Sequence, residues 1–453
     1  MASLTFYGGV NEIGGNKILV EDKGTRVFFD FGLSFAKGTA FYTGFLSARG
    51  VSGAADDLEL GILPRIKGLY SAEQLRFSDL KYEPPKFDAI FPSHAHMDHC
   101  AHLQYIDPGI DIHLGETTNK IIQTFKPGEK EEEALGVHPY KTFRTGDKVK
   151  VGEIEVEPIH VDHSVPGAYG FLIHTSEGTI AYSGDYRLHG PAGKMTEDFV
   201  ERAAAAEPVA FITEGTRFGR KENGRSLSEE GVRKAANRIV GKADGFVAAT
   251  YYGRDIDRIK TFYQVAKDND RKFVVSMRTA HLMNKLKDDP RLGVPDPLKD
   301  PDIRIYARRK KTGTYAGQDY YLWERPYLEN HCGFEHVQSE CKRCLLQLDL
   351  YNFTELVDIK PQGGHFIHSM SEPFSEGGMD QIEQDVMLAW LKHFKLRFHQ
   401  AHASGHMSPE EIKEVVEKIK PKRVYPIHTE QPDMMKKLYK KTVMVKEGKS
   451  YNI

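Results

Sequence analysis

Cysteine is scarce in this chain, with four residues in 453. So low a count excludes a disulfide-stabilised scaffold and is typical of a reducing compartment, so we expect a cytoplasmic location. No apolar run approaches the ~20 residues that a membrane-spanning helix needs, and the first residues do not resemble a secretion signal. The formal net charge of −2 provides no overall positive field for a nucleic acid. A polyanionic partner would therefore have to bind a local patch.

What the chain does contain is a concentrated run of metal-binding side chains. The apolar residues Ala89–Phe91 are soon followed by His94, His96, Asp98 and His99. This pattern predicts a buried strand that ends in a loop, and the spacing lets the first two histidines converge on one ion while Asp98 and His99 face a second. Imidazole and carboxylate ligands suit zinc, and also manganese or iron. The alternative is an ordinary polar loop whose histidines are satisfied by hydrogen bonds.

Further candidate ligands follow other predicted strands. His163 comes after a strand near 154–160, Asp185 ends a strand that begins at 179, and Glu214 and His428 end strands that begin at 209 and 424. Ligands from separate strand ends can meet at one sheet edge, so we predict that His163 and Asp185 join the histidine loop. Asp30, at the end of another predicted strand, is interpreted as a hydrogen-bonding group that orients this loop.

The pattern of predicted secondary structure changes near residue 217. Strands and helices alternate from there on, which predicts a parallel sheet with right-handed crossovers. We therefore expect an α/β chain with three segments: 1–216 and 396–453 form one domain, and 217–395 forms a second one inserted into it. The irregular segment 33–85 is long for a connection and is expected to be functional or to carry short helices.

Taken together, these motifs resemble the β-CASP nucleases of the metallo-β-lactamase fold. The resemblance rests on the His-x-His-x-Asp-His loop, the later His163, Asp185 and His428, and the Thr-Glu-Gly-Thr motif around Glu214. The Gly-Gly-x-x-Glu-Ile-Gly segment at 8–14 and the His-x-Ser-Gly-His segment at 402–406 are most similar to ribonuclease J, particularly its short archaeal-type members. The fold implied is an αββα sandwich with an inserted β-CASP domain built on a parallel sheet.

The resemblance implies a role for each candidate residue. His94, His96 and His163 would bind one zinc ion, Asp98, His99 and His428 a second, and Asp185 would bridge them. A metal-bound hydroxide would attack the phosphodiester, and the ions would neutralise the developing charge. Glu214 would fix a ligand histidine, and His406 would stabilise the transition state or protonate the leaving 3′-oxygen. An ordinary helix-capping role is the alternative for His406.

For the substrate, the resemblance implies single-stranded RNA, cleaved from the 5′ end and also internally. The family would hold RNA phosphates with residues at two turns, namely Ser369, Ser371, His402, Ser404 and Gly405; a plain serine-rich turn is the alternative at Ser369. Two basic clusters could follow a nucleic-acid backbone: Arg217, Arg220, Lys221 and Arg225, and Arg308–Lys311. The second could equally be a solvated surface.

Three cysteines in the predicted insert raise the question of a third, structural zinc. Cys341 and Cys344 form one half of a tetrahedral site, and Cys332 with a nearby histidine could supply the other half. The alternative is a small local core of reduced thiols.

Four other hypotheses stay open at this point. The same centre could serve a DNA-repair nuclease or an endonuclease of the mRNA 3′-end type. A small-molecule hydrolase is disfavoured, since it needs no second domain, and an inactive binding protein is disfavoured by the full ligand set. Manganese could replace zinc, and a homodimer is possible.

Overall fold

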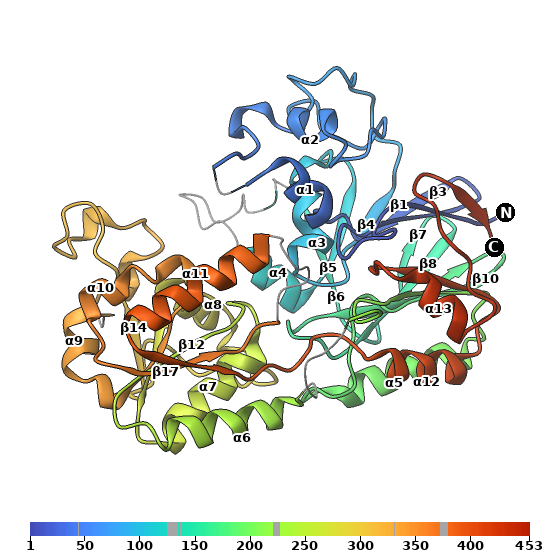
Figure 1. The fold of residues 1–453 in the computed structure, drawn as a ribbon. Helices are drawn as coiled ribbons and strands as arrows, with labels where there is room; N and C mark the ends of the chain where they lie inside the picture. The colour runs from blue at the N-terminus through green and yellow to red at the C-terminus, as the bar shows by residue number, and fades with distance from the viewer. Residues whose placement is uncertain (44, 125–134, 136–137, 221–226, 330, 372–378) are drawn as a thin grey trace. The chain divides into compact units, whose positions relative to one another are not determined.

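The computed structural model describes residues 1–43, 45–124, 135, 138–220, 227–329, 331–371 and 379–453. The chain divides into two compact units. The first comprises the described residues of 1–123, 132–221 and 405–453, and the second those of 124–131 and 222–404. The first unit contains two sheets and the second contains one (Figure 1). Each unit has its own hydrophobic core.

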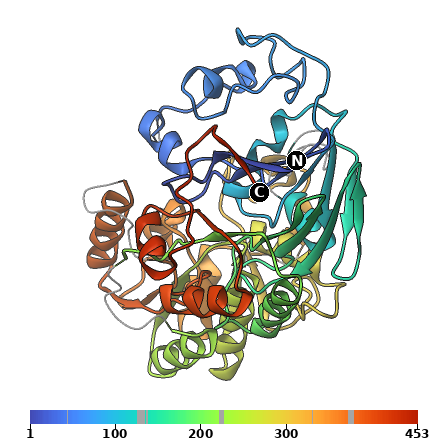
Figure 2. The same ribbon diagram turned by 90° about the vertical axis from the view of Figure 1, so that its right-hand side faces the viewer.

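The first unit contains two facing β-sheets. One has the strand order β20-β1-β2-β3-β4-β5-β6, with bounds β1 Ser3–Gly8, β2 Lys17–Asp22, β3 Thr25–Phe29, β4 Ala89–Phe91, β5 Asp111–Gly115, β6 Tyr140–Phe143 and β20 Ser450–Asn452. The other has the order β19-β11-β10-β9-β8-β7, with bounds β7 Val149–Val151, β8 Ile154–His160, β9 Tyr169–Thr175, β10 Gly178–Tyr182, β11 Ala210–Glu214 and β19 Val424–Ile427. Because β20 pairs with β1, the two chain ends lie close together (Figure 2).

Aromatic side chains fill the space between the two sheets. Phe29 stacks on Phe91 within the first sheet and meets Phe171 of the second edge-on, with ring centroids 5.6 and 5.3 Å apart. Burial of such rings supplies much of the stabilising free energy of a sandwich core. The outer face of the second sheet is covered by α5 (Gly193–Ala205) and α12 (Pro409–Ile419). The αββα arrangement predicted for this part of the chain is confirmed.

Shorter helices complete the first unit. The irregular segment carries α1 (Phe35–Phe41) and α2 (Ala55–Glu59), as expected for a connection of that length. The others are α3 (Met97–Cys100), α4 (Glu116–Ile122) and α13 (Pro432–Leu438). Helix α12 begins with a complete capping box between Ser408 and Glu411, which explains its sharp start.

The second unit is built on one seven-stranded sheet with the order β15-β14-β13-β16-β12-β17-β18. Its strands are β12 Phe246–Thr250, β13 Lys272–Ser276, β14 Ile303–Tyr306, β15 His331–Cys332, β16 Cys344–Gln347, β17 Gly364–His368 and β18 Leu396–Gln400. Every pairing in this sheet is parallel, which confirms the prediction from the alternating pattern. Its helices are α6 Glu229–Val240, α7 Ile256–Asp268, α8 Met277–Leu286, α9 Phe334–Ser339, α10 Glu355–Ile359 and α11 Met379–His393.

Strand β18 belongs to this second unit. We expected residues 396–400 to open the segment that returns to the first unit, but β18 pairs along its whole length with β17. The first unit resumes only at Gly405. The hydrogen-bonding partner of a strand is a tertiary property, so the local sequence could not reveal it. Among the helices of the described residues, none is long and apolar enough to cross a membrane.

Candidate metal centre

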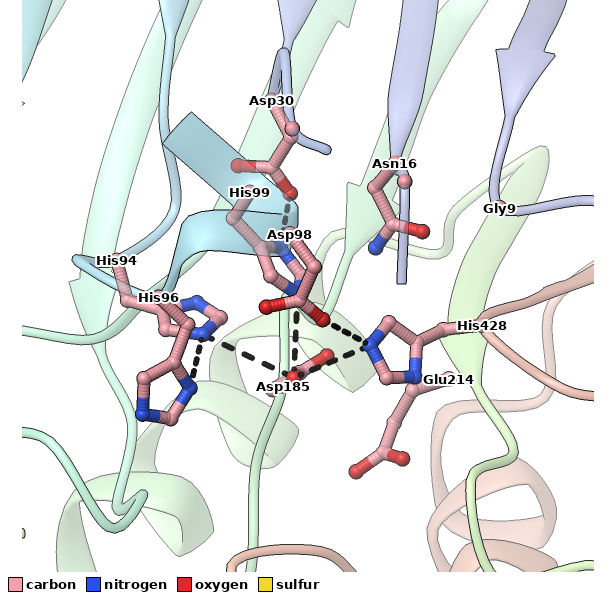
Figure 3. A network of polar contacts seen from close by, with 12 residues as sticks. Gly9, Asn16, Asp30, His94, His96, Asp98, His99, Asp185, Glu214 and His428 are labelled. Carbon is pink, nitrogen blue, oxygen red and sulfur yellow. Dashed lines mark hydrogen bonds and ion pairs between the residues drawn. The ribbon is translucent and has the colours of Figure 1, made fainter. Parts of the chain in front are cut away.

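The candidate ligands all follow the carboxyl ends of strands in the first unit. The loop after β4 carries His94, His96, Asp98 and His99, while His163, Asp185 and His428 follow β8, β10 and β19. Strands β8, β10, β11 and β19 run in the same direction, so their ends meet at one edge of the second sheet. Figure 3 shows the side chains of the loop after β4, together with Asp185 and His428, converging from separate elements.

The first set of ligand atoms consists of three imidazole nitrogens. His96 Nδ1 lies 3.0 Å from His94 Nε2 and 3.1 Å from His163 Nε2. Asp185 Oδ2 lies 3.8 Å from His94 Nε2 and 3.9 Å from His163 Nε2. Zinc–nitrogen bonds of about 2.0–2.1 Å in a tetrahedral site separate the ligand atoms by roughly 3.3 Å. The spacing of this set therefore fits one zinc ion.

The second set combines a carboxylate with two imidazoles. His428 Nε2 lies 3.0 Å from Asp98 Oδ2, and His99 Nε2 lies 3.7 Å from the same oxygen. Asp185 Oδ2 is 3.2 Å from His99 Nε2 and 3.6 Å from His428 Nε2. The same oxygen therefore faces both sets, and Asp185 Oδ1 is buried without a hydrogen-bond partner among the described residues. A shared, unsatisfied carboxylate of this kind fits a bridge between two cations.

Hydrogen bonds fix the outer nitrogen of four of these histidines. The Nδ1 atoms of His94 and His163 contact Ser93 Oγ at 3.0 Å and the Gly405 carbonyl at 2.7 Å. Those of His99 and His428 contact Asp30 Oδ2 at 2.7 Å and Thr216 Oγ1 at 2.8 Å. With Nδ1 held in this way, Nε2 of each ring is presented to the centre, as in established metal sites.

The charge balance of the centre favours a cation. Burial lowers the pKa of His94 and of His163 well below the usual range, so these imidazoles are neutral and available as ligands. Burial alone would also lower the pKa of His99, but the charges of Asp185, Asp30 and Asp98 outweigh it and raise that pKa well above its usual value. The carboxylates thus demand a compensating positive charge, which a divalent cation would supply.

Asp30 plays the orienting role that we predicted for it. It is fully buried, accepts the Ser93 N–H at 2.6 Å and the His99 bond described above, and also accepts the Tyr182 hydroxyl. Asp30 and His428 both adopt a left-handed backbone, with φ of 58° and 52°. Such conformations cost free energy in residues other than glycine and concentrate at functional sites.

Two glycine loops close around helix α3. Gly32 lies so near the helix that an added Cβ would come within 1.7 Å of the Asp98 carbonyl oxygen, and Gly14, with φ of 81°, lies against the Asp98 side chain. The buried Lys17 ammonium donates to the Gly32 carbonyl at 2.5 Å and to the Gly15 carbonyl at 3.2 Å, which ties the two loops together. The sequence alone did not single out Lys17.

Lys17 predicts a measurable pH dependence of stability. Burial lowers its pKa from 10.5 to about 7, so between these values the unfolded chain holds a proton that the folded protein has lost. Stability should then rise with pH, by about 1.4 kcal/mol for each pH unit. We expect the free energy of unfolding of the wild type, relative to Lys17→Met, to increase by about 2 kcal/mol from pH 7.5 to pH 9 in urea titrations with chelator. Parallel pH profiles for the two proteins would contradict this.

Thr216 connects two functional groups through its hydroxyl. This oxygen donates to Glu214 Oε2 at 2.5 Å and lies 2.8 Å from His428 Nδ1, and the side chain is buried. Since the hydroxyl proton goes to the carboxylate, the imidazole must supply the proton of the second bond, which fixes the His428 tautomer. Sequence reasoning missed Thr216, because a threonine after a strand is too common to be a signal.

Removing the Thr216 hydroxyl should weaken metal binding at the second set. We expect Thr216→Val to lower the affinity for the more weakly held ion by roughly 10- to 100-fold, measured by competition with a chromogenic chelator. Thr216→Ser, which keeps the hydroxyl, is the matched control and should bind like the wild type. Equal affinities for the valine and serine variants would show that the hydroxyl does not matter.

Glu214 contacts His406 rather than a ligand histidine. We expected Glu214 to fix a ligand, but its Oε1 lies 3.0 Å from His406 Nδ1, and it reaches His428 only through Thr216. Glu214 is fully buried, whereas the His406 side chain is 21% exposed and lies 3.8 Å from Asp185 Oδ2. A buried carboxylate behind a partly exposed imidazole is the arrangement of a positioned proton donor.

Comparison with known proteins agrees with this geometry. Residues 67–222 match the beta-lactamase superfamily domain, and residues 392–443 match the Zn-dependent metallo-hydrolase RNA specificity domain. The chain is 24% identical over 435 residues to ribonuclease J of Helicobacter pylori, and 25% identical over 444 residues to that of Thermus thermophilus. The chain has the metallo-β-lactamase fold and resembles ribonuclease J. These alignments cover 94% and 93% of the chain.

The ribonuclease J relatives are longer proteins. The chain spans about half the length of the first of them, 56% of the Helicobacter protein, and 67% of the Thermus protein. A solved structure from Enterococcus faecalis, described as a protein of unknown function, superimposes with a TM-score of 0.76, 23% identity and 99% coverage of both chains. That likeness agrees with the fold of the described residues.

The residues assigned to RNA phosphates from the ribonuclease J resemblance have different surroundings. Ser369 is 1% exposed, its hydroxyl donates to the Ala401 carbonyl at 2.5 Å, and its oxygen accepts from Arg258 at 2.5 Å. His402 Nδ1 lies 3.2 Å from the Ser369 carbonyl oxygen, so the structure does bring these two residues together. Because its hydroxyl is buried and committed, Ser369 builds the turn rather than offering a phosphate contact. Gly405 holds His163, and Ser371 is half-buried.

The second basic cluster has most of its side chains engaged within the protein. In the second, Arg309 pairs with Asp358 and Lys310 with Glu324, each at 2.6 Å, while Arg308 bonds Asn352. In the first, Arg217 donates to the His406 carbonyl at 3.4 Å, whereas Lys221 and Arg225 lie outside the described residues. The Arg309 and Lys310 charges are therefore largely neutralised within the protein.

The predicted third zinc has no ligand set among the described residues. The groups of metal-binding side chains found there all belong to the centre described above and include no cysteine. Cys332 and Cys344 are buried in the apolar core of the second unit, and Cys341 packs against it. Burial raises the pKa of Cys332 to about 12 and that of Cys344 to about 11, which opposes the thiolate that zinc requires. These observations favour the alternative of reduced thiols in a local core.

Proposed function

We propose that this protein is a metal-dependent phosphodiesterase that cleaves RNA, and that it holds two zinc ions. The observation that carries the proposal is one carboxylate oxygen, Asp185 Oδ2, placed within 3.9 Å of ligand nitrogens of both sets. His94, His96 and His163 would hold one ion, Asp98, His99 and His428 the other, and Asp185 both. The match of residues 392–443 to an RNA specificity domain supports RNA as the substrate.

Each part of the centre has a distinct task. When bound by these residues, the two zinc ions would lower the pKa of a water molecule and offset charge on the phosphate. Hydrogen bonds to Nδ1 fix the orientation of four ligand imidazole rings, and their partners are Asp30, Ser93, Thr216 and the Gly405 carbonyl. Glu214 holds His406 by Nδ1, so Nε2 of that ring is the atom that would donate a proton to the leaving 3′-oxygen. Burial of the ligand residues excludes bulk water and strengthens these electrostatic interactions.

The substrate can be resolved in one set of digestions. We expect 5′-labelled single-stranded RNA to be cut in the presence of zinc or manganese, with a 5′-monophosphate end favouring products shortened stepwise from that end. RNA with three or no terminal phosphates should then give mainly internal cuts. Matched DNA of the same sequence is the control, since faster cleavage of DNA would instead support a repair nuclease. Less than one metal ion per chain after zinc loading would contradict a dinuclear centre.

A further inference from the structure

The carboxyl edge of the seven-stranded sheet in the second unit presents an unusual set of side chains. In parallel α/β sheets, ligands bind outside the carboxyl ends of the strands where neighbouring crossovers go to opposite faces. Strands β12 and β16 are neighbours, and the chain leaves them in opposite directions across the sheet. From β12 it crosses past β16 to β13, whereas from β16 it crosses past β12 to β17. Helices α9, α10 and α11 pack on the face of the core that contains Phe246 and Leu346, whereas α6 and α7 pack together beyond the other face (Figure 1). The edge at β12 and β16 is such a switch point.

Cations lie along this edge. Arg278 follows β13, is exposed, and has no ion pair with any residue that the structure describes. Arg308 follows β14, is exposed, and bonds the uncharged Asn352. Asn352 accepts from Arg308 and donates to Asp349 at the end of β16, so the Arg308 guanidinium lies near this carboxyl group. Burial raises the pKa of Asp349, and the charges of Arg308 and Arg278 oppose that rise.

Exposed aromatic rings lie among these cations. Tyr252 follows β12 and is 49% exposed, and Tyr351 follows β16 and is 81% exposed. The acidic side chains of the same loops are withdrawn, because Asp255 is buried as the N-cap of α7 and Asp349 accepts from Asn352. The Tyr351 hydroxyl donates to the exposed Glu383 at 3.5 Å, so one surface acid lies beside that ring. In the described loops after β12 and β16, the edge therefore offers aromatic rings and positive charge while Asp255 and Asp349 are engaged within the protein.

We propose that this edge binds the backbone and bases of single-stranded RNA, with Arg278 and Arg308 on phosphates and Tyr252 and Tyr351 stacked on bases. Stacking rings interleaved with arginines are how proteins hold single strands without reading sequence. From β14 to β12, the strands that these four residues follow, the edge crosses three inter-strand gaps, roughly 14 Å at about 4.8 Å each, which is enough for about two nucleotides. The assignment rests on the proposed function and goes beyond it, since it names a binding surface remote in sequence from every metal ligand.

Binding can be measured separately from cleavage. The probe is an unstructured 12-nucleotide RNA with a 3′ fluorophore, mixed with the full chain in chelator and followed by anisotropy. We expect Tyr252→Ala and Arg278→Gln each to weaken binding by about fivefold or more, and Arg278→Gln to reduce the slope of log affinity against log salt by about 0.7. Tyr252→Phe should restore binding, because it keeps the ring.

The matched control is Arg343→Gln. Arg343 is 78% exposed and precedes β16, at the opposite edge of the same sheet, so its replacement should leave affinity within twofold. Wild-type affinity in both Tyr252→Ala and Arg278→Gln, or an equal loss in Arg343→Gln, would overturn the proposal.

Hydrolysis of bis(4-nitrophenyl) phosphate by the zinc-loaded proteins tests the proposed function independently. It needs the metal centre alone, so Arg343→Gln should match the wild-type rate, and no turnover by the zinc-loaded wild type would contradict the proposed function only.

Discussion

Replacing His406 by alanine is expected to lower the rate of RNA cleavage by about 10²- to 10⁴-fold, the usual contribution of a positioned general acid. The reason is geometric: Nδ1 of this ring is held by Glu214 at 3.0 Å, and the ring is partly exposed beside Asp185. The metal content should stay at the wild-type level, because every proposed ligand is intact. Single-turnover cleavage and metal analysis on the same preparation check both statements.

The substrate can serve as the control for this variant. A phosphodiester with a good leaving group, such as 4-nitrophenolate, needs little protonation, so His406→Ala should lose much less activity on it than on RNA. Glu214→Gln keeps a hydrogen-bond acceptor for His406 but removes the charge, and we expect an intermediate loss of roughly 10- to 100-fold. If the metal content of His406→Ala fell together with activity, the ring would be a structural or ligand group instead.

Replacing Arg258 by methionine is expected to destabilise the second unit by about 3–5 kcal/mol, the cost of leaving a buried charge unpaired. Arg258 is fully buried and bonds Glu229 through two nitrogens, at 3.2 and 3.1 Å. It also donates to the carbonyls of Ser369 at 2.6 Å and Ala403 at 3.2 Å, which joins the turns after β17 and β18. Urea-induced unfolding followed by tryptophan fluorescence would report the loss, since Trp323 and Trp390 both lie in this unit.

Two further variants locate the origin of this effect. Arg258→Met combined with Glu229→Gln removes the orphaned carboxylate and should recover part of the lost stability. Arg233→Met removes a partly exposed arginine of α6 that pairs with Glu230, and should unfold like the wild type. An Arg258→Met variant with wild-type stability would show that the network contributes no net free energy.

Much of this protein could be predicted from local patterns. The His-x-His-x-Asp-His run, with apolar residues before it, indicates both a strand and a metal-binding loop, because periodicity and ligand chemistry are properties of neighbouring residues. The alternation of strands and helices after residue 217 indicates a parallel sheet for the same reason. The orienting role of Asp30 followed from its place at a strand end.

Other features depend on contacts between distant segments. Glu214 was expected beside a ligand histidine, yet it bonds His406, 192 positions later, and only the pairing of β11 with β19 brings Thr216 to His428. Lys17 and Arg258 carry no local signal, since a buried cation is recognised by the carbonyls that surround it. The Ser369 hydroxyl was expected to contact an RNA phosphate, but it is buried and hydrogen-bonded to Arg258 and to the Ala401 carbonyl.

The sequence by itself determined which residues could bind metal, where most strands and helices lie, and that the second unit has a parallel sheet. The tertiary structure alone decided that β18 joins that sheet, which side chain Glu214 holds, and which candidate residues are buried. The physical reason is that ligand type and hydrophobic periodicity are encoded over a few residues, whereas burial and hydrogen-bond partners are set when segments hundreds of residues apart come into contact.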